Sequence, residues 1–387
     1  CINSLGSRNL LLLLLYIKGG IYLQKRTLLI TLFIALIITS YSFCEKPAIS
    51  AQSAVLIDAQ SGRVLLEYNP HIKLPMASTT KIMTALIALE NGELKDKVKI
   101  DKDAVGIEGS SIYLYENEYI TLEDLLYGLM LRSGNDSAMA IAKHIGGDLE
   151  GFIQMMNKKA REIGANNSNF TNPHGLHDDN HYSTAYDLAL ITREAMKIEE
   201  FKKISKTKRW KANRDKNNLF YNKNDTLWDY EGGDGVKIGY TKRAGRCLVS
   251  SATRMDTQLI SVVLNDGNWF NDCYRLMDYG FDNFDTYVIF DKGQYFNKIS
   301  VENGIKDFTP IIVKDSFSYP LQEEEIERIK LYVDLPDIIK APIKKNEPIG
   351  NVAVYLDGKL IHEEKLITRE NINKLGPINK ILKKLQR

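Results

Sequence analysis

Apolar positions divide most of the chain into a short β segment, a long helical segment and a second β segment. Residues 54–68 hold two apolar runs around a polar turn at 58–62, which predicts a β-hairpin. Residues 247–252 and 258–264 predict two further strands that pair across a polar turn. Helical spacing of apolar residues predicts helices at 78–90, 121–131, 136–145, 149–163, 184–197 and 268–283. Strands at both ends of this region indicate a sheet flanked by helices, with an additional helical cluster.

Local signals mark several of the predicted helix ends. Thr121 and Thr184 each stand three positions before an Asp, an arrangement typical of a capped helix N-terminus. Gly92 and the pair Gly146-Gly147 are typical of residues just beyond a helix C-terminus. The helix boundaries are therefore predicted from capping as well as from apolar periodicity.

The pattern changes after residue 287. Short apolar segments at 311–313, 329–333 and 352–356 alternate with turns rich in Pro, Gly and Glu, and Asp357-Gly358 is a two-residue hairpin signal. These features predict a small all-β domain at 288–366. They also assign 51–287 to the preceding domain, which carries the helices.

Both ends of the chain show features of surface or targeting segments. Lys25 and Arg26 precede an uncharged, mostly apolar run at 27–44, and small residues stand beyond it at Ala48, Ser50 and Ala51. This pattern predicts a signal peptide within a leader segment at 1–50, with cleavage after Ser50, and therefore export; a retained membrane helix is the alternative. Residues 367–387 form a basic tail with amphipathic spacing, which predicts contact with an anionic membrane surface, although a solvated end explains it equally well.

Composition narrows the class of protein. The 387 residues are 44% hydrophobic and 26% charged, which excludes a disordered chain and a membrane protein with many spanning helices. The formal net charge is +2, and because five basic residues and one acidic residue lie in 1–46, the remainder carries −2. A nucleic-acid partner is therefore not expected. The four cysteines do not form a disulfide framework, and Cys247 and Cys273 are predicted to be buried free thiols.

Three short motifs carry candidate chemistry. In Ser78-Thr79-Thr80-Lys81, a serine and a lysine three positions apart lie on one face of a helix. The lysine amine can act as the base for the serine if its pKa falls from about 10.4 towards about 7–8, a shift of roughly 4 kcal/mol that burial or a neighbouring cation must supply. Backbone N–H groups at the helix start can stabilise an oxyanion. Taken alone, the pair is also explained by a helix cap and a solvated lysine.

The second and third motifs are Ser133-Gly134-Asn135, in a turn between predicted helices, and Lys237-Ile238-Gly239, on a predicted strand. Each has a plain structural explanation as a turn or as a strand end. In this order and in these contexts, however, the three motifs match the S-x-x-K, S-x-N and K-T-G set of penicillin-binding proteins and class A β-lactamases.

The sequence resembles the D-alanyl-D-alanine carboxypeptidases, the low-molecular-mass penicillin-binding proteins, over about residues 50–366. The resemblance rests on the three motifs and on the stretches 170–176, 234–237 and 239–245. It implies a β-lactamase/transpeptidase-like catalytic domain, with an antiparallel sheet flanked by helices and a helical cluster, followed by a small all-β domain. This fold class is α/β plus β.

The resemblance also implies a role for each motif residue. Ser78 is the expected nucleophile towards the terminal D-Ala-D-Ala bond and Lys81 its base, while Ser133 relays the proton and Asn135 orients Lys81 and the substrate. The expected substrate-binding residues are Lys237, Gly239 and Thr241. The backbone N–H groups of Ser78 and Tyr240 are the expected oxyanion hole.

The implied function is that of an exported enzyme at the outer face of the cytoplasmic membrane or in the cell wall. Its partners are expected to be peptidoglycan stem peptides as substrates and β-lactams as covalent inhibitors. No cofactor and no metal are expected. A zinc site built from His174, His177 and His181 is the weaker alternative, because the spacing lacks the His-Glu-x-x-His arrangement.

One position departs from the family pattern. Ile238 stands where relatives have a Thr whose hydroxyl helps to hold a carboxylate, so affinity is expected to fall roughly tenfold to a hundredfold. Thr241 is a candidate to compensate. Two alternatives stay open: a class A-like β-lactamase, although no clear deacylating Glu is present, and a non-catalytic protein that senses peptidoglycan or penicillin.

Overall fold

The computed structural model describes residues 46–376. Residues 1–45 of the predicted leader and residues 377–387 of the predicted tail lie outside the described residues. No helix within residues 46–376 combines the length and the apolar character that crossing a membrane requires.

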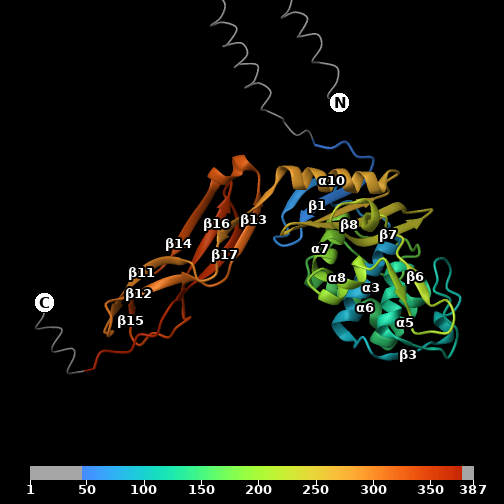
Figure 1. Cartoon of the computed structure of the whole chain (residues 1–387), viewed down its shortest axis with the longest axis horizontal. Helices are drawn as coiled ribbons and strands as arrows, with labels where there is room; N and C mark the ends of the chain where they lie inside the picture. The colour runs from blue at the N-terminus through green and yellow to red at the C-terminus, as the bar shows by residue number, and fades with distance from the viewer. Residues whose placement is uncertain (1–45, 377–387) are drawn as a thin grey trace, which may run out of the picture. The chain divides into compact units, whose positions relative to one another are not determined.

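A five-stranded antiparallel sheet organises the first part of the described chain, in the order β2-β1-β9-β8-β7. Strands from residues 53–68 lie beside strands from residues 233–264, so the sheet joins the two ends of this region as the sequence predicts (Figure 1). Strand β7 forms one edge. The five strands are β1 (Ser53–Asp58), β2 (Val64–Tyr68), β7 (Gly233–Thr241), β8 (Gly245–Arg254) and β9 (Thr257–Leu264).

Helices cover both faces of this sheet. Helix α10 packs on one face with an apolar cluster beneath it, and α7 and the central helix α3 lie on the other face with the larger core (Figure 1). Because both faces are covered, β1 is buried along its whole length. The helices are α3 (Lys81–Asn91), α4 (Leu122–Leu131), α5 (Asn135–Gly146), α6 (Leu149–Glu162), α7 (Ala185–Ala195), α8 (Glu199–Lys206), α9 (Thr226–Asp229) and α10 (Trp269–Asn283).

The predicted caps are present. The Thr121 hydroxyl accepts a hydrogen bond from the backbone N–H of Asp124 at 3.1 Å, and the Thr184 hydroxyl accepts one from Asp187 at 3.0 Å. Gly92 and Gly147 occupy the C-cap positions of α3 and α5. Capping needs only neighbouring residues, and for this reason the sequence is sufficient to predict it.

The helix predicted at 78–90 begins later than expected. Residues Ala77–Thr80 form a 3-10 turn, η1, and the α-helix begins only at Lys81. The hydroxyls of Thr79 and Thr80 donate to the carbonyls of Met76 and Ala77, three residues earlier, at 2.6 and 2.8 Å. These short-range bonds fit the tighter winding of a 3-10 turn. Ser78 therefore precedes the α-helix.

Shorter elements connect the helices and form the walls of the helical cluster. In the hairpin β5–β6 the intervening loop lies at residues 212–218. The elements are β3 (Lys97–Lys99), η2 (Lys102–Ala104), β4 (Tyr119–Thr121), β5 (Arg209–Lys211) and β6 (Leu219–Tyr221).

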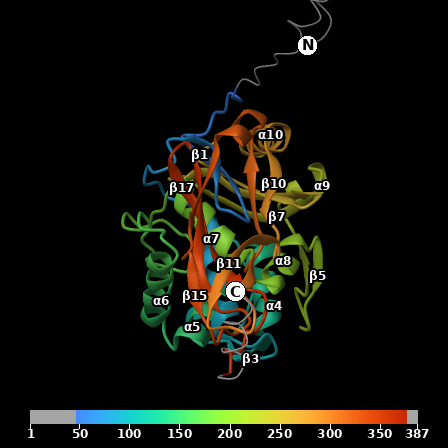
Figure 2. The same ribbon diagram turned by 90° about the vertical axis from the view of Figure 1, so that its left-hand side faces the viewer.

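The last part of the described chain is β-structured, drawn in orange to red in Figures 1 and 2. Its main sheet has six strands in the order β14-β16-β17-β12-β11-β15, and β10 pairs with β13. Asp357 and Gly358 join β16 to β17 with φ values of 51° and 79°, the positive pair of a type I′ hairpin turn, so the predicted hairpin is confirmed. The elements are β10 (Asp285–Phe290), β11 (Tyr295–Glu302), β12 (Phe308–Val313), β13 (Phe317–Leu321), η3 (Glu323–Arg328), β14 (Ile329–Asp334), β15 (Ile338–Lys340), β16 (Pro348–Leu356) and β17 (Lys359–Thr368).

Candidate active site

The three motifs meet at the edge of the sheet next to the helical cluster. Ser78 lies in η1, Lys81 is the first residue of α3, and Asn135 begins α5. The Lys81 Nζ lies 2.9 Å from the Ser78 Oγ and 2.7 Å from the Asn135 Oδ1. Residues separated by more than 50 positions in the sequence thus surround one amine.

Lys81 has a third neighbour that the motifs do not include. Its Nζ donates to the backbone carbonyl of His174 at 2.6 Å. An ammonium has three N–H donors, whereas a neutral amine has two donors and one lone pair. Two oxygens that only accept, on Asn135 and His174, and one hydroxyl that can donate, on Ser78, match the neutral form. The surroundings of Lys81 therefore suit an amine that accepts the serine proton.

Burial and charge both favour the neutral form of Lys81. The side chain is fully buried, which lowers its pKa well below the ordinary lysine value, and the nearby positive charge of Lys237 lowers it further. The carboxylate of Asp136 acts in the opposite direction. Loss of hydration is the largest of these effects, so the fold itself supplies the shift that the sequence argument requires.

Asn135 is held so that its oxygen faces Lys81. Its Nδ2 donates to the Glu108 carbonyl, and its backbone N–H donates to the Ser110 carbonyl at 2.7 Å. Because the amide nitrogen is engaged by a carbonyl, the other end of the amide must be the oxygen. The segment that contains residues 108–110 thus orients Asn135, a function that the motif alone does not reveal.

Two residues of the motif region have a backbone conformation that is unusual for side chains with a Cβ. Ser133 has φ of 62° and Ala77, next to Ser78, has φ of 49°. Such conformations cost on the order of 1–3 kcal/mol and cluster at functional sites. The Ser133 side chain is buried, and its hydroxyl has no hydrogen-bond partner within residues 46–376. The hydroxyl is therefore available to a bound molecule.

Lys237 is a second buried amine. Its Nζ donates to the carbonyl of Ile238 at 3.0 Å. Burial lowers the pKa of Lys237 to about 7, and the positive charge of Lys223 contributes to this decrease. Lys223 belongs to none of the three motifs, so the sequence did not identify it as a neighbour of the site.

Gly239 allows β7 to approach the Ser78 turn. A Cβ at this position would lie 2.9 Å from the Ser78 nitrogen and 3.1 Å from the Met76 carbonyl oxygen. Gly239 is an expected substrate-binding residue, and the structure adds a close approach to the backbone of the protein itself. Tyr240 is exposed, and the Thr241 hydroxyl accepts a hydrogen bond from the Ala244 backbone at 3.0 Å.

The half-buried Ile238 packs against the apolar cluster beneath α10. On a strand, successive side chains point to opposite faces, so Ile238 lies on the face opposite that of Lys237 and Gly239. A branched aliphatic residue is accommodated at this position through packing.

The loop at residues 172–176 positions the carbonyl that Lys81 contacts. The Thr84 hydroxyl donates to the Pro173 carbonyl at 2.6 Å. Gly175 has φ of 86°, and a Cβ there would lie 1.9 Å from the carbonyl oxygen of Ala77. The loop thus lies directly against η1, the turn that contains Ser78. Its stretch is part of the family resemblance, but no side-chain pattern identifies a functional backbone carbonyl.

The three histidines of this region have separate partners. His181 contacts the Thr80 hydroxyl at 2.8 Å and accepts from the Thr171 backbone at 3.0 Å, and burial lowers its pKa to about 4. The pKa of His174 is lowered to about 3, mainly by burial, and His177 lies 3.3 Å from Asp179. Within residues 46–376, no three His, Cys, Asp or Glu side chains converge as a metal site.

Cys247 and Cys273 are buried free thiols, as predicted. Burial raises the pKa of each to about 12, so neither is a thiolate at neutral pH. They contribute to packing and do not supply a competing nucleophile.

The fold and the serine–lysine geometry define a serine-type peptidase of the penicillin-recognising class. The chain belongs to the D-alanyl-D-alanine carboxypeptidase family, whose model matches residues 41–268, and residues 284–374 match the model of the penicillin-binding protein 5 C-terminal domain. The resemblance predicted from the motifs is therefore confirmed, as is the predicted fold class.

Several relatives match nearly the whole chain. The D-alanyl-D-alanine carboxypeptidase DacF of Bacillus subtilis is 34% identical over 337 residues, which cover 84% of this chain and 87% of the relative. DacC of Escherichia coli is 34% identical over 86% of both chains. Penicillin-binding protein 5 from Haemophilus influenzae superposes with a TM-score of 0.72 at 33% identity, covering 85% of this chain and 99% of that structure.

Proposed function

We propose that this protein is an exported serine-type D-Ala-D-Ala carboxypeptidase that removes the terminal D-alanine from peptidoglycan stem pentapeptides. The observation that carries the proposal is the buried Lys81 amine 2.9 Å from the Ser78 hydroxyl. Family membership supports the reaction type, and the named relatives are enzymes of the same specificity.

In the proposed acylation step, neutral Lys81 takes the Ser78 proton as the Oγ attacks the carbonyl carbon of the D-Ala-D-Ala bond. The backbone N–H groups of Ser78 and Tyr240 stabilise the developing oxyanion. The C–N bond then breaks, and Ser133 relays the proton from the Lys81 ammonium to the leaving D-alanine amine. Asn135 keeps the Lys81 amine aligned through this exchange. Water hydrolyses the resulting ester and regenerates Ser78.

The free edge of β7 is the proposed binding surface for the extended peptide. An edge strand offers unpaired backbone groups to an added strand. Lys237 and Thr241 are the proposed contacts for the substrate carboxylate, and Gly239 keeps the strand close to Ser78. β-Lactams mimic the scissile bond and are proposed to acylate the same serine.

Export and association with the outer membrane face or the cell wall follow from the predicted leader and tail. The described N-terminal residues refine the proposed cleavage point. The Ser50 hydroxyl donates to Asp266 at 2.5 Å, and the Tyr68 hydroxyl donates to the Pro47 carbonyl at 2.5 Å. Cleavage upstream of Pro47 preserves both contacts, whereas cleavage after Ser50 removes them.

Mass spectrometry after exposure to ampicillin tests the proposal. The expected result is one acyl adduct, on the peptide that contains Ser78, together with release of D-alanine from a pentapeptide. Lys81→Arg should slow acylation by about 10²- to 10⁴-fold, because arginine does not lose its proton; Lys159→Arg on the surface of α6 is the matched control. An adduct elsewhere, or full activity of Lys81→Arg, contradicts the proposal.

The persistence of the adduct separates the carboxypeptidase from the two alternatives. An adduct that lasts minutes to hours is expected for the carboxypeptidase. Turnover of the drug within seconds indicates a β-lactamase, and binding without D-alanine release indicates a sensor.

A further inference from the structure

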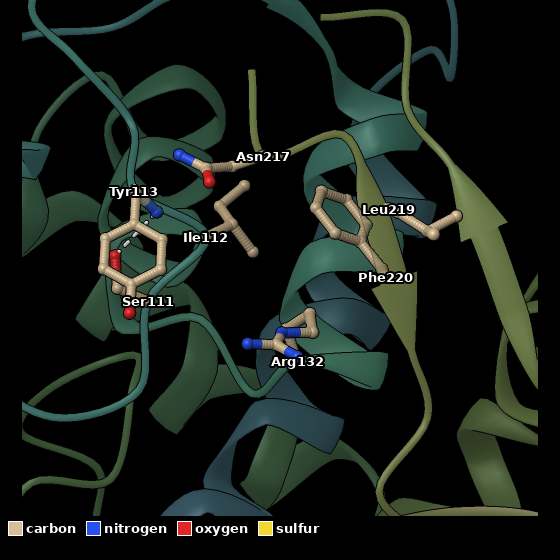
Figure 3. Close-up of a pocket in the computed structure, with 7 residues that line it drawn as sticks. All are labelled: Ser111, Ile112, Tyr113, Arg132, Asn217, Leu219 and Phe220. Carbon is tan, nitrogen blue, oxygen red and sulfur yellow. Dashed lines mark hydrogen bonds between the residues drawn. The ribbon is translucent and has the colours of Figure 1, made fainter.

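A small cavity opens beside the candidate active site, between the segment that orients Asn135 and the β5–β6 hairpin. It has a volume of about 90 Å³. Ser111 and Tyr113 form one side, Leu219 and Phe220 form the other, and the Arg132 guanidinium extends into the space between them (Figure 3). A cavity of this volume holds a few water molecules. The cavity can thus take a carboxylate-sized group.

Arg132 brings a positive charge that the described protein leaves uncompensated. It is the residue immediately before Ser133 and is half-buried. Within residues 46–376, its guanidinium forms no hydrogen bond and no ion pair. A guanidinium has five donors in a planar fork that suits a carboxylate.

A second arginine, Arg214, supports the cavity wall from behind and does not line the cavity. Arg214 is buried and pairs with Glu118 at 2.6 Å, and its remaining donors bind the carbonyls of Ile112 and Tyr113. Arg214 therefore builds the wall of the cavity, and its charge is neutralised. Arg132 is the cavity arginine that lacks a partner among the described residues.

Asp136, four positions after Arg132 in the sequence, does not pair with it. The Asp136 carboxylate accepts from the Ser111 hydroxyl at 2.6 Å and from the backbone N–H groups of Ile112 and Leu114. A second cation is also close, since the positive charge of Arg132 adds to loss of hydration in lowering the pKa of Lys223. Arg132 and Lys223 thus bring two basic side chains close together.

We propose that Arg132 is a specificity-determining residue that binds a free carboxylate of the stem peptide, distinct from the carboxylate of the leaving D-alanine. This inference rests on the proposed carboxypeptidase function, in which the leaving carboxylate is assigned to Lys237 and Thr241. Two groups on a stem peptide have the required chemistry: the α-carboxylate of a γ-linked D-glutamate and the side-chain carboxylate of a diaminopimelate.

Matched pentapeptides test the assignment and distinguish the two sources. One pair carries either D-glutamate or its α-amide, and the other carries either diaminopimelate or its side-chain amide. Diacetyl-lysyl-D-alanyl-D-alanine lacks both carboxylates and gives the baseline activity. We expect the parent enzyme to prefer the free carboxylate of one pair by roughly tenfold in kcat/KM, the size of a partly exposed charged hydrogen bond.

Arg132→Gln should abolish this preference and leave cleavage of the diacetyl tripeptide and acylation by penicillin unchanged. Arg132→Lys should retain part of the preference, because it keeps the charge but loses the planar fork. Lys242→Gln, an exposed change of the same charge just beyond β7, is the control and should retain all of it.

Equal rates of the parent on both members of both pairs overturn the inference. So does an Arg132→Gln variant that keeps the preference, or that slows all substrates equally, or a Lys242→Gln variant that loses the preference to the same extent. Failure of the parent to cleave any of these peptides, the tripeptide included, instead contradicts the proposed function.

Discussion

The Lys81 amine and the Asn135 side-chain oxygen lie 2.7 Å apart, although 54 positions separate them in the sequence. An amide oxygen accepts an N–H without carrying a formal charge. Asn135 therefore fixes the direction of the amine and stabilises the ammonium less than a carboxylate would. A base that must be neutral to act benefits from this difference.

Asn135→Asp tests the importance of the uncharged partner. The substitution places a carboxylate next to Lys81 with little change in shape, and an adjacent negative charge raises the pKa of a lysine. The acid limb of the pH profile for penicillin acylation should move upward by at least about one pH unit, and acylation at pH 7 should fall about tenfold or more. Stopped-flow measurement with a fluorescent penicillin gives both values. Asn271→Asp, on the surface of α10, is the control, and an unmoved acid limb contradicts the argument.

The lowered pKa of Lys237 predicts that the stability of the fold depends on pH. Its pKa is about 7 in the folded protein, whereas the unfolded chain restores a value near 10.5, so unfolding takes up a proton between these values. Between pH 7 and pH 10.5 the free energy of unfolding should therefore rise by about 1.4 kcal/mol per pH unit. The same amount is lost again as the pH falls from 10.5 to 7. Lys237→Met should remove this dependence of the unfolding free energy on pH.

Urea unfolding of the parent and of Lys237→Met at several pH values measures this effect. The stability gained by the variant should be greatest near pH 7 and below, and should shrink towards pH 10. Lys242→Met gives the comparison for an exposed lysine. A stability difference that does not vary with pH would show that Lys237 is not held with a low pKa.

Gly175→Ala tests the contact between the 172–176 loop and η1, the turn that contains Ser78. The added methyl group would lie 1.9 Å from the Ala77 carbonyl oxygen, in a residue with positive φ. Gly164→Ala is a matched control, since Gly164 has a similar φ of 83° but no atom within 4 Å of the added Cβ. Both variants pay about 1–2 kcal/mol for the backbone conformation, and Gly175→Ala should lose about 1–3 kcal/mol more by overpacking.

Thermal unfolding compares the two glycine variants, and penicillin acylation reports on the geometry at Ser78. We expect Gly175→Ala alone to slow acylation. Equal stability and equal acylation rates in the two variants would refute the proposed coupling between the loop and the turn.

Ile238→Thr addresses the departure from the family pattern. Ile238 lies on the face opposite that of Lys237 and Gly239, so a threonine hydroxyl can reach the substrate carboxylate only around the strand edge. In that case the variant should gain roughly tenfold to a hundredfold in kcat/KM for a pentapeptide; an unchanged kcat/KM shows that the hydroxyl stays on the far face. The expected cost is a small loss of stability, because the apolar cluster beneath α10 loses a packed side chain. D-Alanine release by the parent and the variant decides the question. A parent without activity and an active variant would make the natural chain a pseudo-enzyme.

The parts that the sequence predicted well depend on local information. The caps at Thr121 and Thr184 involve neighbours three positions away, and the β16–β17 turn needs only Asp357 and Gly358. Helix α8 was not predicted, since it is a short amphipathic segment that directly follows another helix.

In the candidate site, too, some features could be predicted from the sequence and others could not. Residue types and their order were sufficient to nominate Ser78, Lys81 and Asn135 and to predict the class of protein. The carbonyl of His174 and the nearness of Lys223 to Arg132 depend on how loops pack, and no periodicity encodes this packing. Backbone groups and long-range charge are therefore the elements that the structure adds.

The open edge of β7 also affects how the chain behaves before it meets a ligand. An edge strand that can bind the proposed peptide substrate can equally accept a strand from another copy, which is a route to aggregation. Lys242 and Arg243 follow the strand directly, and charged residues at such positions discourage edge-to-edge association. The β7 edge can thus stay open for the proposed peptide substrate, while the charged residues after it limit aggregation.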